Sequence, residues 1–104
     1  MGYLARNPGM SFTAWDGDTL VGAVLCGHDG RRGYLHHLAV DRAYRGQGIG
    51  RALVDQCHAA LREQGIDKVH IFVYRENQVA LTFWAGAKYV PRENLALLSA
   101  NLNE

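Results

Sequence analysis

The sequence has few of the residues that mark specialised protein classes. Only two of its 104 residues are cysteine and two are proline. Cys26 and Cys57 have neither a CxxC nor a metal-ligand spacing, which favours reduced, mostly buried thiols over a disulfide or a nucleophile. The five histidines form no HExxH motif and no paired Cys/His pattern, so no metal site is predicted.

Long apolar runs and clusters of one charge are missing as well. No apolar run approaches the roughly 20 residues of a membrane span, and the first ten residues contain no signal-peptide core. A cytoplasmic protein with no membrane partner is therefore expected. The formal net charge is +1 and Arg31-Arg32 is the only adjacent basic pair, so no nucleic-acid partner is predicted.

The remaining composition, 48% hydrophobic and 20% charged, is typical of one globular domain over residues 1–104. Turn signals and alternation predict a short lead over residues 1–10 with a turn at Asn7-Pro8-Gly9, and then strands over 11–15, 19–26 and 34–40, separated by hairpin turns at 16–18 and 29–33. Helix and strand patterns then predict a helix ending at Gln64, a strand over 68–74, a helix from the N-cap Asn77 to about Ala85, and a closing hairpin of 89–90 and 94–101. Because a helix connects strands 34–40 and 68–74, these two strands should be parallel neighbours.

The stretch between strand 34–40 and the first helix predicts an anion site. It reads RGQGIGR over residues 45–51, and its three glycines allow a sharp bend and a close approach of a ligand to the main chain. The first N–H groups of the following helix lack intrahelical partners and bind phosphate oxygens favourably. The stretch is neither a Walker A loop nor a Rossmann fingerprint, because it lacks the closing Lys-Ser/Thr pair and the third glycine at the required spacing.

The same residues resemble a known family. RGQGIG matches the Arg/Gln-x-x-Gly-x-Gly/Ala signature of the GNAT N-acetyltransferase superfamily, and it follows the strand end LAVD over residues 38–41. Residues 77–84, NQVALTFW, resemble the Asn-x-x-Ala-x-x-Phe-Tyr helix of that family. The resemblance covers about residues 11–104. It implies an α/β (α+β) fold with a mixed, mostly antiparallel sheet, a central parallel strand pair and flanking helices.

Family members usually have a strand and one or two helices before the position of Ser11. The chain is therefore expected to be a short or N-terminally truncated member that lacks most of these elements. A sheet edge and an apolar helix face left bare by that loss would favour a homodimer.

The resemblance also implies an activity, the transfer of an acetyl group from acetyl-CoA to a primary amine on a small molecule or a peptide. It implies that the backbone N–H groups of Leu38 and Val40 bind the pantetheine and the thioester oxygen. Asn77 either caps its helix or contacts the pantetheine, and Phe83 and Trp84 are core aromatics or walls of an acyl pocket. The full set of implied CoA-binding residues is Leu38, Ala39, Val40, Arg45, Gly46, Gln47, Gly48, Ile49, Gly50, Arg51, Asn77, Phe83 and Trp84.

The catalytic groups are predicted from strand alternation and from the resemblance together. Tyr34 and His36 should share one face of their strand and His37 the other. His36 is the preferred general base, because an imidazole titrates near neutral pH, although a histidine here could also be a hydrogen-bonded core residue. The family's acidic tyrosine falls on Trp84, whose indole cannot supply a proton, so Tyr74 is the predicted substitute.

Two other interpretations remain open at this point. The chain could be a CoA-binding module without turnover, or a fragment that is stable only as a dimer. A covalent route is disfavoured, because neither cysteine falls on a site position.

Overall fold

The structure, a computed structural model, describes residues 3–6 and 11–103. These residues form a five-stranded sheet with the strand order β1-β2-β3-β4-β5, together with two α-helices and a short 3-10 helix. In chain order the elements are β1 (Tyr3–Arg6), β2 (Phe12–Asp16), β3 (Thr19–His28), β4 (Gly33–Val40), η1 (Arg42–Tyr44), α1 (Ile49–Glu63), β5 (Val69–His70) and α2 (Gln78–Gly86). Neither α1 nor α2, nor any other described helix, is long and apolar enough to cross a membrane.

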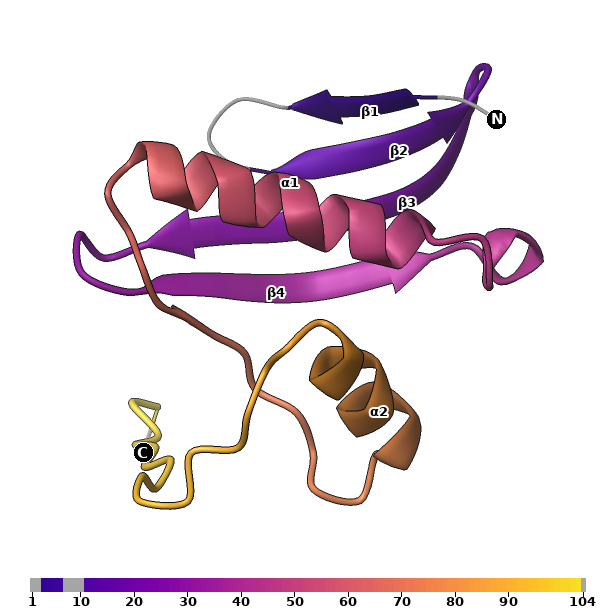
Figure 1. The fold of residues 1–104 in the computed structure, drawn as a ribbon. Helices are drawn as coiled ribbons and strands as arrows, with labels where there is room; N and C mark the ends of the chain where they lie inside the picture. The colour runs from indigo at the N-terminus through magenta and orange to yellow at the C-terminus, as the bar shows by residue number, and fades with distance from the viewer. Residues whose placement is uncertain (1–2, 7–10, 104) are drawn as a thin grey trace. The chain divides into compact units, whose positions relative to one another are not determined.

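Strands β1 to β4 form an antiparallel meander, as Figure 1 shows. The predicted hairpins are confirmed, since β2 and β3 meet at Gly17-Asp18 and the β3–β4 loop spans residues 29–32. In that loop Asp29 Oδ1 accepts 2.9 Å hydrogen bonds from the backbone N–H groups of Arg32 and Arg31, which hold the pKa of the carboxyl below its usual range.

The N-terminal prediction is wrong in one respect. Residues 3–6 are not a loose lead, because they form β1 and pair with β2 through Leu4–Ala14 and Arg6–Phe12. The run YLAR is short and only partly apolar, so its sequence pattern alone did not identify a strand. The predicted turn at Asn7-Pro8-Gly9 lies outside the described residues.

Helix α1 lies along one face of the sheet, over β2, β3 and β4 (Figure 1). The predicted helix is confirmed, and its apolar residues at helical spacing form a buried stripe: Ile49, Leu53, Val54, Cys57, Ala60 and Leu61. Helix and strands touch closely at both ends of this contact. A Cβ added at Gly22 would lie 3.2 Å from the Leu53 side chain, and one at Gly33 only 2.7 Å from that of Leu61.

The parallel strand pair is confirmed, but it is short and lies at the edge of the sheet. Strands β4 and β5 pair through Gly33–Val69 and Tyr34–His70, and the Gly33 N–H donates a 2.9 Å hydrogen bond to the Lys68 carbonyl. The predicted strand over 68–74 is wrong beyond His70, because residues 71–74 have no strand assignment.

Residues 75–103 belong to a second compact unit. Its helix α2 begins as predicted, with the Asn77 side chain accepting a 3.0 Å hydrogen bond from the Ala80 N–H. The predicted hairpin over 89–101 is wrong, since the described residues after α2 contain no strand. Their leucines are not packed as strand residues would be, and Leu98 is 88% exposed.

Candidate active site and cofactor site

The segment between β4 and α1 is held in place by its own hydrogen bonds. Asp41 caps η1, accepting a 2.9 Å hydrogen bond from the Ala43 N–H on its side chain and another from the Tyr44 N–H on its carbonyl. The Arg45 Nε–H turns back and donates to the Val40 carbonyl at 3.1 Å. The chain therefore leaves β4 along a fixed path and enters the glycine turn, residues 45–50, at a defined position.

Two glycines give this turn its shape. Gly46 and Gly48 both have φ near 81°, a left-handed conformation that costs other residues about 1–2 kcal/mol. Gly48 is the N-cap of α1 and has no capping side chain, so the first N–H groups of the helix are available to another acceptor. A Cβ at Gly46 or Gly48 would meet no atom within 4 Å, so space remains beside the backbone for a bound group.

Positive charge lies close to the turn. Arg51 is in the first turn of α1 and pairs with Asp55 at 3.7 Å, with both side chains largely exposed to solvent. The Arg45 side chain begins at the start of the turn and follows the end of β4. The helix N-terminus and these two guanidinium groups make the turn suitable for an anion such as a pyrophosphate.

A shallow pocket of about 340 Å³ adjoins the end of β4. It is lined by Leu20, Val21, Gly22, Ala23, Ala39, Val40, Asp41, Arg42 and Arg45. Three of these residues, Ala39, Val40 and Arg45, belong to the set of cofactor-binding residues predicted from the sequence. The pocket and the glycine turn are thus both built on the segment that leads from β4 to α1.

Strand β4 contains a bulge in its C-terminal half. Leu25 on β3 pairs with His36 and Ala23 pairs with Ala39, so two residues of β4 oppose one residue of β3. His37, in the bulge, has φ of 53°, which is uncommon for a residue other than glycine. Because of the extra residue, Ala39 faces the same side of the sheet as His36.

The bulge also changes the arrangement of the histidines. As predicted, Tyr34 and His36 lie on one face, with stacked rings whose centroids are 6.4 Å apart. Simple alternation placed His37 on the opposite face, but its ring centroid lies 6.2 Å from that of His36. The alternation prediction is therefore wrong at His37, because the left-handed backbone there interrupts the strand.

His70 lies beside the candidate catalytic residues, although the sequence patterns did not select it. Its ring centroid lies 5.8 Å from that of Tyr34, its register partner across the parallel pair. Tyr34, His36 and His70 therefore form a row of rings across β4 and β5, on the face away from α1. The predicted parallel pairing of strands 34–40 and 68–74 could have identified His70, because this pairing places residues of the two strands side by side.

The predicted general acid, Tyr74, does not belong to a strand, so the pairing of β4 and β5 does not place it in this row of rings. It is 84% exposed and lies four residues beyond the end of β5. Strand alternation therefore no longer assigns its side chain to the face of Tyr34.

The second unit brings the predicted aromatic residues together. The rings of Phe83 and Trp84 meet edge to face at 5.0 Å, and Trp84 and Tyr89 meet in the same way at 5.0 Å. Trp84 thus lies at the centre of a three-ring cluster, in keeping with a packing role. Asn77 is engaged in capping α2.

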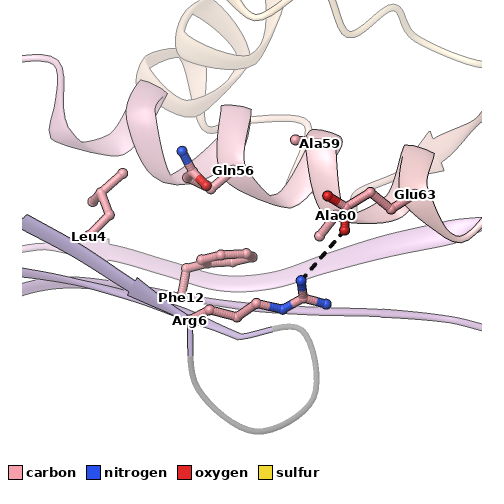
Figure 2. A pocket seen from close by; sticks show the side chains of 7 residues that line it. All are labelled: Leu4, Arg6, Phe12, Gln56, Ala59, Ala60 and Glu63. Atoms are coloured by element: carbon pink, nitrogen blue, oxygen red, sulfur yellow. Dashed lines mark ion pairs between the residues drawn. The ribbon is translucent and has the colours of Figure 1, made fainter.

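A second pocket, of about 220 Å³, lies between the β1–β2 edge of the sheet and α1 (Figure 2). Phe12 and Leu4 project into it from the strands, and Gln56 faces them from the helix. An ion pair of 3.7 Å between Arg6 and Glu63 crosses one end. The glycine turn contributes no residue to this pocket.

Comparisons with known proteins agree with the geometry. Residues 2–87 match the family model described as acetyltransferase (GNAT) family. An acetyltransferase of Sodalis glossinidius is 29% identical over 97% of this chain and 71% of its own length.

Solved structures show the same fold. An aminoglycoside acetyltransferase from an uncultured soil metagenomic sample has a TM-score of 0.76 and 23% identity, covering 93% of this chain and 68% of its own. A chain of the NatC complex, bound to Gag peptide and CoA, has a TM-score of 0.65 and 28% identity, covering 74% of this chain and 55% of its own. With its glycine turn, its mixed sheet and a family match over most of its length, this chain belongs to the acetyltransferase (GNAT) family.

Proposed function

We propose that this protein transfers an acetyl group from acetyl-CoA to a primary amine. The observation that carries the proposal is the glycine turn, where two left-handed glycines leave space beside the N-terminus of α1. A charged, phosphate-bearing ligand with a long flexible arm fits a site made of a helix N-terminus and a strand end. Members of this family use acetyl-CoA, which has that chemistry.

In this proposal the main chain binds most of the donor. The N–H groups of Gln47, Gly48, Gly50 and Arg51 bind the pyrophosphate, and those of Leu38 and Val40 bind the pantetheine and the thioester oxygen. Such preorganised donors stabilise the negative charge that develops on the oxygen during attack. The other residues assigned to the donor site are Ala39, Arg45, Gly46, Ile49, Asn77, Phe83 and Trp84.

The reaction follows from the chemistry of an amine and a thioester. The amine nitrogen must lose its ammonium proton before its lone pair can attack the carbonyl carbon, and His36 accepts that proton. The new C–N bond forms, the C–S bond breaks, and the leaving thiolate takes a proton from Tyr34 or Tyr74. The ring row of His36, Tyr34 and His70 supports the assignment of His36, because His36 is exposed and belongs to the strand that leads to the glycine turn.

The acceptor is proposed only as a class, a primary amine on a small molecule or a peptide. Both kinds of acceptor are represented among the similar proteins, an aminoglycoside acetyltransferase and the peptide-bound NatC complex.

A second candidate is a CoA-binding module without turnover. It is favoured by Trp84, which stands where the family tyrosine is expected and is engaged with Phe83 and Tyr89 in an aromatic cluster. A fragment that is stable only as a homodimer is a separate alternative, and sedimentation of a well-folded monomer would count against it.

The deciding experiment combines calorimetry with a thiol-release assay. The full chain is titrated with acetyl-CoA, CoA and dephospho-CoA, and thiol release is then followed with a panel of primary amines, an aminoglycoside and a peptide with a free N-terminus. Binding with amine-dependent thiol release supports the transferase. Binding without release on any acceptor supports the module, and absence of binding overturns the assignment of the glycine turn.

A further inference from the structure

The two cysteines lie opposite each other in the contact between α1 and the sheet. On the helix, Cys57 lies midway between Leu53, which touches the Gly22 position, and Leu61, which touches the Gly33 position. Four residues of helix span about 6 Å, close to the length of two strand residues. Cys57 is therefore expected over β3 between Val24, counted from Gly22, and Cys26, counted from the Gly33–His28 pair.

Cys26 occupies that part of β3, on the same face. It pairs with Leu35 of β4, a buried residue two positions from Gly33, and alternation from Gly22 brings positions 24, 26 and 28 to the helix side. Each thiol is the largest single influence on the pKa of the other, so the two side chains are neighbours in this contact. Cys57 is fully buried and Cys26 only partly so, and both are free.

The two sulfurs differ in reactivity. The hydrogen bond from Cys57 and the positive charge of Arg6 lower the pKa of Cys26, against the opposing effect of burial. The pKa of Cys57 is raised, because it donates the shared hydrogen bond and is desolvated. Since the thiolate is the nucleophile, Cys26 is the attacking thiol and Cys57 the resolving one.

We infer that Cys26 and Cys57 form a thiol–disulfide exchange site that a low-molecular-weight disulfide can oxidise. The Cys26 thiolate attacks one sulfur of the small disulfide, which forms a mixed disulfide and releases one small thiolate. Cys57 then attacks the Cys26 sulfur, releasing the second thiolate, and the two cysteine protons end on the two released thiols. The product is a covalent bond between β3 and the middle of α1.

The pocket in Figure 2 contains a charged side chain, Arg6, that acts on the cysteine pair. Arg6 lines that pocket, and its charge also acts on Cys26. Gln56 and Ala60, on either side of Cys57 along the helix, line the same pocket. A small anionic disulfide such as oxidised glutathione suits this approach, because Arg6 lies beside the path and favours both the thiolate and an anionic reagent.

The test uses the full chain with oxidised glutathione under native conditions, followed by intact mass and non-reducing peptide mapping. We expect a loss of two hydrogen atoms, a peptide that joins Cys26 to Cys57, and a Tm higher by several degrees, because the bond restricts the unfolded chain. Cys57→Ser should stop at a single glutathione adduct on residue 26, whereas Cys26→Ser should give no adduct. Arg6→Gln should slow oxidation severalfold without preventing it.

Several results would overturn the inference. They are failure to form an intramolecular disulfide, formation only in denaturant, and a disulfide between two chains. Equal reactivity of the two single variants would also overturn it, because the buried Cys57 thiol would then react as readily as the partly exposed Cys26 thiol. Each readout is independent of acetyl transfer, so failure of the proposed activity leaves this test intact.

Discussion

The phenolic hydroxyl of Tyr44 donates a 2.7 Å hydrogen bond to Asp16 Oδ2, and this contact joins η1 to the end of β2. Asp16 lies 28 residues before Tyr44, at the turn between β2 and β3. The bond therefore holds the segment that leads into the glycine turn against a part of the sheet that takes no part in the site. The Asp16 carboxylate raises the pKa of Tyr44 by accepting this bond.

Tyr44→Phe is expected to lower stability slightly at neutral pH and to weaken CoA binding severalfold, because the entry to the turn loses an anchor. The pKa of Tyr44 is raised in the folded state. The hydrogen bond therefore stabilises the fold fully below the pKa of an unfolded tyrosine, about 10, and this stabilisation is lost as pH rises through the pKa of Tyr44 in the folded state. Urea unfolding of both proteins at about pH 7 and about pH 11 checks this. A stability difference that persists unchanged at the higher pH would contradict it.

Gly48→Glu tests the anion site. It is expected to reduce CoA affinity by more than about tenfold, because the new carboxylate stands where phosphate oxygens approach. Gly17→Glu is the matched control, since Gly17 also has a positive φ, 59°, and also has no atom within 4 Å of a Cβ. Both variants should lose about 1–2 kcal/mol of stability from backbone strain. Calorimetric titration should then separate them, and equal loss of CoA binding in both would count against the site.

Gly33→Ala tests the contact between α1 and the sheet. A Cβ here would lie 2.7 Å from Leu61 Cδ1, and Leu61 is buried, so about 1–3 kcal/mol of stability should be lost. Gly27→Ala, in β3, should be close to neutral, because a Cβ there meets no atom within 4 Å. Leu61→Val combined with Gly33→Ala should lose less than the sum of the single variants, since valine lacks the clashing atoms. Strict additivity in chemical denaturation would argue against the clash.

His36→Gln is expected to lower the rate of acetyl transfer by about a hundredfold, with the largest loss at low pH, where the neutral amine is scarcest. His37→Gln is the control, since His37 is also exposed and neighbours His36 but lies in the bulge. The measurement is the pH profile of kcat/KM for the wild type and both variants. A profile unchanged by His36→Gln would transfer the role of base to Tyr34 or to water.

Asn77→Ala should lose about 1 kcal/mol of helix stability in α2, because it removes the bond to the Ala80 N–H. Asn77→Ser keeps a capping oxygen on a shorter side chain and should retain most of the helix. Circular dichroism measures the helix, and calorimetry measures CoA affinity. If Asn77 also contacts the pantetheine, both variants should bind CoA more weakly; normal affinity in Asn77→Ser would leave capping as its whole role.

The helix α1 and the turn before it could be predicted because their signals are local. The buried stripe at Leu53, Cys57 and Leu61 follows the helical period, and two of the three glycines of the turn occur where the backbone is left-handed. The hairpin turns and the Asn77 cap were predicted for the same reason, since each is determined by a few adjacent residues.

Strands after α1 were less predictable, because a strand depends on a partner that supplies its hydrogen bonds. The apolar run 68–74 has a strand composition, but only Val69 and His70 pair with β4. Residues 89–101 similarly contain apolar residues without forming strands. The bulge was invisible for another reason: nothing in the residue type of His37 signals its φ of 53°, which depends on the register with β3.

Helix α1 packs closely on the sheet at two points, Gly22 and Gly33, and a change at one of them is expected to tilt the helix. Gly22 lies under its first half and Gly33 under its C-terminal end, so we expect a side chain at Gly33 to push the C-terminal end of α1 away from the sheet while the first half stays in contact with β3. The N-terminus of the helix, with the N–H groups proposed to bind phosphate, would then tilt. Substitutions at Gly33, beneath the C-terminal end of α1, should therefore change the orientation of the glycine turn without altering any residue in it. Differences in ligand affinity among related sequences can then originate at small residues of the sheet.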